Sequence, residues 1–108
     1  MKYRIHITDV AEAEAEQEYL WLMGVNPDAA GRWYDGLFEA LESLTEMPHR
    51  FPIAPREIAN DPDVRMMLYG NRPSTFRILF RIFESEDESG AEGEVRVLRI
   101  VHGARELP

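Results

Sequence analysis

Hydrophobic and polar residues alternate with a period of two at the beginning of the chain, which is typical of a half-buried strand. The apolar side chains at positions 3, 5 and 7 share one face of this predicted strand. Residues 9–23 consist mostly of Ala, Glu, Gln, Leu and Met, which are strong helix formers, and Thr8 and Asp9 offer a helix N-cap. We therefore predict a strand and then a helix that ends at Gly24.

A second helix is predicted directly after the first. Asn26 can cap its N-terminus, and Pro27 suits the first helical position. Apolar residues then recur three and four positions apart until Pro48 stops the pattern, which indicates a helix with one buried face. Because the link between the helices is short, we expect an antiparallel helical hairpin. The apolar stripe of the second helix consists of Ala30, Trp33, Tyr34, Leu37, Leu41 and Leu44.

Three strand-like runs follow, at residues 64–69, 75–83 and 95–101. The proline-rich residues 47–63 before them predict an extended loop, and the acidic residues 85–93 predict a hairpin tip. Strict alternation in the second run places apolar residues on one face. In the last run, the alternation places Val95, Val97 and Val101 on one face and Arg96, Leu98, Ile100 and His102 on the other.

The order of these elements predicts an α+β fold. The N-terminal strand and a three-stranded antiparallel meander form one sheet. The helical hairpin, which lies between them in sequence, packs on one face of this sheet and leaves the other face open. At 108 residues, we expect a single domain that spans residues 1–108.

Composition narrows the function classes. The chain has no cysteine, which excludes a disulfide scaffold, a thiol nucleophile and a cysteine-ligated zinc site. No segment reaches the roughly 18 apolar residues of a membrane span, and the N-terminus does not resemble a signal peptide. Three scattered histidines do not have metal-ligand spacing. We expect a cytoplasmic protein with no metal, no cofactor and no membrane partner.

The net charge of −8 is the sum of an acidic helical region and a basic sheet region. Residues 9–46, which form the predicted hairpin, carry a net −9, and the segment from Glu84 to Glu94 adds six acids. Residues 64–83 and 95–108 carry a net +6, and all of their bases are arginines. Arginine can pair bidentately with phosphate or carboxylate, so the sheet is a candidate anion-binding surface.

Several residues of this basic region are candidates for a functional site. Both features also have a purely structural interpretation. The arginines can form the solvated face of the sheet, and His102 can be a strand-end histidine that is hydrogen-bonded to the backbone. Alternatively, His102 acts as a general acid or base beside arginines that neutralise a phosphate. The candidate binding residues are Arg77, Arg81, Arg96, Arg99, Arg105 and Tyr69.

Several stretches of the chain carry a family resemblance: residues 3–14, NPDAA at 26–30, LESL at 41–44 with the following Met-Pro, and residues 64–70, 76–82 and 97–105. Together they give nearly the whole chain, apart from the acidic segment, a resemblance to the RelE/ParE superfamily of bacterial toxins. It implies the predicted α+β fold and the toxin of a type II toxin–antitoxin pair. It also implies that a cognate antitoxin neutralises the chain and that contact with DNA occurs only indirectly, through the antitoxin.

The resemblance leaves three functions open. A ParE-like toxin binds DNA gyrase and performs no chemistry of its own. A RelE-like toxin is a metal-independent endoribonuclease that cleaves mRNA on the ribosome, and Arg65, Arg81 and His102 are the matching catalytic candidates. An inactive homologue retains only antitoxin binding. The single lysine, Lys2, and the negative net charge favour a toxin that is ParE-like or has an undefined target. We expect an amphipathic antitoxin segment to cover the exposed apolar and arginine-bearing surface.

Overall fold

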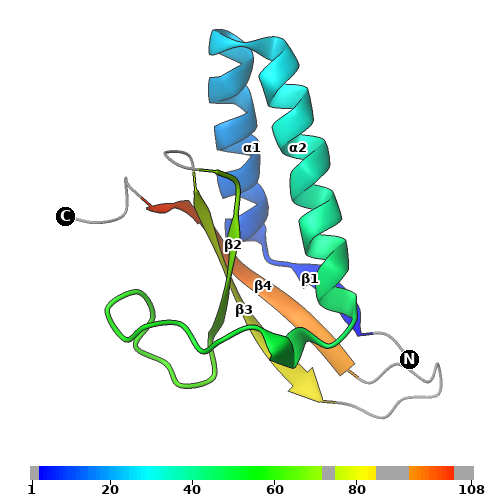
Figure 1. Ribbon diagram of the computed structural model, residues 1–108, viewed down its shortest axis with the longest axis vertical. Helices are drawn as coiled ribbons and strands as arrows, with labels where there is room; N and C mark the ends of the chain where they lie inside the picture. Colours follow the sequence, from blue (N-terminus) through cyan, green and yellow to red (C-terminus); the bar gives the residue numbers. More distant parts are fainter. Residues whose placement is uncertain (1–2, 72–74, 85–92, 104–108) are drawn as a thin grey trace.

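The computed structural model describes residues 3–71, 75–84 and 93–103. Two helices form an antiparallel hairpin that covers one face of a four-stranded sheet and extends past the sheet at the end where the helices connect (Figure 1). The predicted α+β class is confirmed. The elements are β1 (Arg4–Ile7), α1 (Asp9–Val25), α2 (Pro27–Glu42), two 3-10 turns (Ser43–Thr45 and Pro48–Arg50), β2 (Arg65–Tyr69), β3 (Phe76–Glu84) and β4 (Gly93–His102).

The helix boundaries follow from side-chain caps. The Thr8 hydroxyl accepts a hydrogen bond from the Ala11 amide, so the cap is Thr8 and α1 begins at Asp9. The prediction that Gly24 ends α1 is wrong, because the helix continues to Val25. Asn26 ends α1 and caps α2 at once: its amide donates to the Leu22 carbonyl, and its side chain accepts from the Ala29 amide. This single shared residue makes the hairpin turn tight.

The order of strands in the sheet is β1-β4-β3-β2. β2, β3 and β4 are antiparallel neighbours, as predicted for a meander, and β1 pairs in parallel with the first half of β4. β1 and β2 are therefore the edge strands. The second half of β4, from Leu98 to His102, extends past β1 and lies beside α1.

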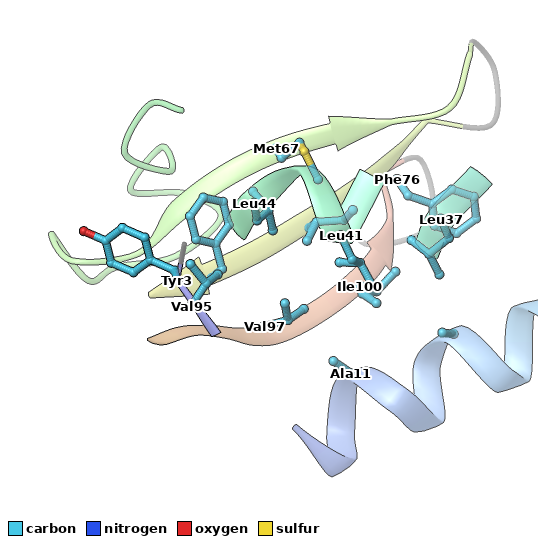
Figure 2. Close-up of a cluster of buried hydrophobic side chains, with 13 residues drawn as sticks. Tyr3, Ala11, Leu37, Leu41, Leu44, Met67, Phe76, Val95, Val97 and Ile100 are labelled. Carbon is cyan, nitrogen blue, oxygen red and sulfur yellow. The ribbon is translucent and has the colours of Figure 1, made fainter. Parts of the chain in front are cut away.

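The main core fills the space between the helical hairpin and the sheet (Figure 2). Phe80, Ile78, Val95 and Val97 from the sheet are fully buried there, together with Leu37 from α2. Tyr3, Ile5 and Ile7 pack against the same core, so the predicted inward face of the first strand is confirmed.

A β-bulge in β4 changes which of its side chains face the core. Leu79 pairs with Arg99 and Phe80 pairs with Val97, which leaves Leu98 as the extra residue. Strict alternation is therefore wrong beyond Val97. Ile100 lies in the core with Val95 and Val97, and His102 joins that side, whereas Val101 faces the other way.

The loop between α2 and β2 folds over the second face of the sheet. Its Ala54 amide donates to the Val64 carbonyl, and the Met66 amide donates to the Pro52 carbonyl. This face is therefore only partly open. The loop and sheet enclose a second small core that consists of Ala54, Val64 and Leu79, with Ile58, Ala59, Met66 and Leu98 packed against it.

Candidate functional site

Three arginines of β3 and β4 lie on the sheet face that the helices leave uncovered. Arg77 and Arg81 share this face of β3, and Arg81 pairs in register with Arg96 of β4. The guanidinium carbons of Arg81 and Arg96 lie 5.2 and 4.3 Å from the centre of the Phe83 ring. We call Arg77, Arg81, Arg96 and Phe83 the arginine face.

Two of these arginines have acidic partners. Arg81 Nη2 lies 3.2 Å from Asp63 Oδ2, and Arg96 Nε lies 2.7 Å from Glu94 Oε2. Arg77 is half-buried beside Gly103, and within the described residues it has no ion pair. An incoming acidic group therefore gains most from Arg77, because it displaces no existing carboxylate there.

Arg65 lies on the opposite face of the sheet from Arg77. One of its terminal nitrogens donates to the Phe51 and His49 carbonyls at 2.6 and 3.2 Å. In this position Arg65 holds the loop after α2 against the start of β2. Part of its hydrogen-bonding capacity is thus used within the fold.

His102 lies at the far end of β4 and packs on the helix-covered side. Its ring contacts Phe76 edge-on, with 5.0 Å between ring centres. Among the described residues, its buried Nδ1 has no hydrogen-bond partner. A groove of about 240 Å³ adjoins it, lined by Glu14, Glu18 and Trp21 of α1.

The three residues matched to RelE-like catalysis are not brought together. His102 pairs in register with Phe76 and Arg65 pairs with Phe80, so their positions differ by four residue steps along β3, or about 13 Å. Arg65 and Arg81 do come together: both line a pocket of about 340 Å³ at the other end of the sheet, together with His49 and Glu84.

That pocket contains an interaction that the sequence did not reveal. His49 Nε2 lies 3.1 Å from Glu84 Oε1, and the Tyr3 hydroxyl donates to both Glu84 oxygens at 2.9 and 3.0 Å. His49 had no foreseeable partner, because Glu84 is remote in sequence and no local spacing signals the contact.

Two further arginines belong to the predicted binding set, Arg99 and Arg105. The Nε and Nη2 groups of Arg99 donate to Glu14 Oε2 at 2.9 and 2.6 Å, and Glu14 Oε1 accepts from the Ile100 amide at 2.9 Å. Glu14 thus ties α1 to the part of β4 that β1 does not reach. Arg105, the last arginine of the predicted set, lies outside the described residues.

Tyr69 lies on the helix-covered side, away from the arginine face. Its hydroxyl donates to the Trp33 carbonyl at 2.7 Å. Burial raises the pKa of the Tyr69 hydroxyl above its ordinary value of 10.0, and the nearby Glu39 carboxylate raises it further. Gly36 makes this contact possible, because a Cβ there would collide with the tyrosine oxygen.

No three His, Asp or Glu side chains among residues 3–71, 75–84 and 93–103 are grouped to hold a metal ion. None of the helices in these ranges combines the length and apolar character needed to cross a membrane.

Comparisons with known proteins agree with the fold. The chain matches, over residues 5–107, the family described as the ParE toxin of the type II toxin–antitoxin system parDE. No curated protein matches it. It is similar in structure to a chain of the "Chromosomal ParDE TA system from P. aeruginosa", with a TM-score of 0.68 and 18% identity over 93% of this chain and 95% of that one. The structural likeness supports the fold, and the family match spans nearly the whole sequence. This chain belongs to the ParE family of type II toxins.

Proposed function

We propose that this protein is a cytoplasmic toxin that acts by binding DNA gyrase, without cleaving RNA, and that a cognate antitoxin neutralises it. The ParE family match supports the toxin role. The similar P. aeruginosa chain comes from a ParDE toxin–antitoxin system, which supports a dedicated antitoxin for this chain as well.

The position of His102 is the observation that favours a binding mechanism over RNA cleavage. Cleavage of RNA through its 2′-hydroxyl needs a general acid or base within hydrogen-bond reach of the reacting oxygens. The arginines that neutralise the phosphate must lie at the same place. His102 packs on Phe76 about 13 Å along the sheet from Arg65, which argues against joint action on one phosphodiester.

The charges of the arginine face favour it as the contact for an acidic segment of the antitoxin. Arg77 is half-buried and has no acidic partner among the described residues, so a carboxylate from an antitoxin segment would form a new charge-assisted hydrogen bond there. At Arg81 the same segment would compete with Asp63. Charge reversal at Arg77 should therefore weaken the complex more than charge reversal at Arg81.

Expression in bacteria, alone and with the neighbouring gene, tests the proposal. The wild type should arrest growth, and co-expression of the neighbouring gene product should restore it. His102→Ala should still arrest growth. Absence of arrest by the wild type would indicate an inactive homologue. Loss of both arrest and mRNA cleavage in His102→Ala would support the ribonuclease alternative.

A further inference from the structure

The end of β4 extends past β1 and lies beside α1 (Figure 1). Between α1 and this end of the strand is a groove of about 240 Å³, which we call the α1–β4 groove. Gln17, Glu18 and Trp21 of α1 line one side of it, and Ile100 and His102 of β4 line the other. A cavity of roughly 150 Å³ accepts a benzene molecule, so this groove can take one long side chain of a partner.

The α1 side of the groove suits a positively charged side chain. Trp21 is 58% exposed, and the face of its ring attracts cations. Glu18, one turn earlier, is only 8% exposed although it lines the same groove, and a charge pair is stronger where water is excluded. A carboxylate accepts several hydrogen bonds at once, so contacts within the fold do not prevent Glu18 from pairing with a further donor. Lysine and arginine match this combination.

The β4 side of the groove contains part of a strand edge that β1 does not reach. The Gly103 amide donates to the Thr75 carbonyl on the β3 side, whereas the Ile100 amide donates to Glu14 of α1. Because successive residues of a strand direct their backbone groups to opposite sides, the Ile100 carbonyl and the His102 amide point toward α1 as well. One residue of an extended segment, parallel to β4 as β1 is, can bond to both groups.

We propose that the α1–β4 groove is the surface through which the toxin binds DNA gyrase, and that it takes an extended basic segment of that enzyme. One residue of the segment bonds to the strand edge at Ile100 and His102. A lysine or arginine of the segment lies over the Trp21 ring and pairs with Glu18. This inference rests on the proposed function, because it assigns the groove to the target named there.

Charge favours this occupant over other partners. Residues 9–46 carry a net −9, so α1 repels a nucleic acid and also the same surface of a second copy of the chain. An acidic segment of the antitoxin fits the arginine face, which has the opposite charge. A basic segment at the groove therefore fits the second protein partner, the target.

The position of the groove also relates target binding to neutralisation. Val101 lines the groove and pairs in register with Arg77 of the arginine face. Paired residues of antiparallel strands lie about 5.5 Å apart. An antitoxin segment bound at Arg77 would therefore lie at the border of the groove and hinder gyrase from entering it.

The first test compares two neighbouring residues of α1 in a gyrase supercoiling assay. Trp21→Ala should raise the toxin concentration needed for half inhibition by about tenfold or more, because exposed tryptophans at the centre of an interface contribute most to binding. The matched control is Leu20→Ala. Leu20 is 60% exposed on the same helix but lies outside the groove, so its loss should change that concentration by less than about threefold.

The second test changes the charge of the groove. Gln17→Lys places a positive charge in the groove and should weaken inhibition by about tenfold, because it repels a basic segment. Ala13→Lys, one turn earlier at an exposed position outside the groove, is the control and should weaken inhibition by less than about threefold. His102→Ala retains the backbone amide and should have an equally small effect. Thermal unfolding verifies that each variant is folded.

The outcomes separate this inference from the proposed function. If Trp21→Ala and Gln17→Lys both inhibit gyrase as well as the wild type does, the groove is not the contact, although gyrase remains the target. If the wild type does not inhibit gyrase, both proposals are wrong. If the two variants lose only the binding of the neighbouring gene product, measured by calorimetry, the groove belongs to the antitoxin and the inference is overturned. Should Trp21→Ala fail to fold, Gln17→Lys decides.

Discussion

Arg81 and Arg96 are directly opposite each other on β3 and β4, and both guanidinium groups lie against the ring of Phe83. Two like charges in a cross-strand pair repel each other. The ring offsets part of this repulsion, because its face attracts cations. Asp63 and Glu94 neutralise the two arginines from either side. The sheet thus holds two positive charges side by side at its surface.

Replacement of Phe83 by leucine should destabilise the protein through the loss of these cation–π contacts. Each is worth about 0.5–1 kcal/mol at an exposed site, so we expect a loss of roughly 1–2 kcal/mol in the free energy of unfolding. Urea denaturation measures it. In an Arg96→Gln background, Phe83→Leu should cost less than in the wild type. Equal costs in the two backgrounds would refute the coupling between Phe83 and Arg96.

Two glycines of α2 should respond in opposite ways to alanine. Gly31→Ala meets no atom within 4 Å and should stabilise the helix by up to about 1 kcal/mol. Gly36→Ala places a methyl group against the Tyr69 hydroxyl and should destabilise the protein by about 1–3 kcal/mol. Thermal unfolding of both variants compares them. In a Tyr69→Phe background, the cost of Gly36→Ala should decrease, and an unchanged cost would contradict the predicted collision.

Stability should decrease at high pH partly because of Tyr69. The folded state raises the pKa of this hydroxyl, so it holds the proton more tightly than the unfolded chain does. The resulting stability is complete below about pH 10 and is lost as the pH rises through the higher pKa of the folded protein. Unfolding measured between about pH 8 and 11 should show a shallower decline in Tyr69→Phe than in the wild type. Identical slopes would argue against a raised pKa.

Tyr69→Phe should also lower the free energy of unfolding at neutral pH. It removes the hydrogen bond to the Trp33 carbonyl, which we expect to cost about 0.5–1.5 kcal/mol. Tyr19→Phe is the matched control for the general effect of losing a hydroxyl.

Glu14 should be more important for stability than the exposed Glu12 of the same helix. Glu14→Gln removes the charge that accepts two hydrogen bonds from Arg99, and we expect a loss of about 1–3 kcal/mol. Glu12→Gln, at an exposed position, should change stability by less than about 0.5 kcal/mol. Denaturation of the two variants tests this difference. Equal stability would mean that the contact between Glu14 and Arg99 contributes nothing to the fold.

Local patterns predicted much of the fold. Asn26 and Pro27 indicated the start of α2, and the alternation at Tyr3, Ile5 and Ile7 indicated the buried face of β1. The start of a helix and the buried face of a strand depend on residues that are close in sequence. They can therefore be predicted from local sequence patterns.

Features that depend on remote contacts could not be predicted in this way. The bulge at Leu98 reverses Ile100 relative to a strict alternation, and no residue near it announces this. Gly24 stands where a helix often ends, yet α1 continues because Asn26 supplies the boundary. The contacts of Arg65 with loop carbonyls and of Tyr69 with Trp33 likewise appear only in three dimensions.

We expect this ParE-family chain to inhibit its target by binding and not by RNA cleavage. The most direct measurement compares two assays on the same purified protein: supercoiling of plasmid DNA by gyrase, and primer extension on mRNA during translation. We predict that supercoiling is inhibited with increasing protein concentration and that the mRNA remains intact. Cleavage of the mRNA with undisturbed supercoiling would contradict the proposed binding mechanism.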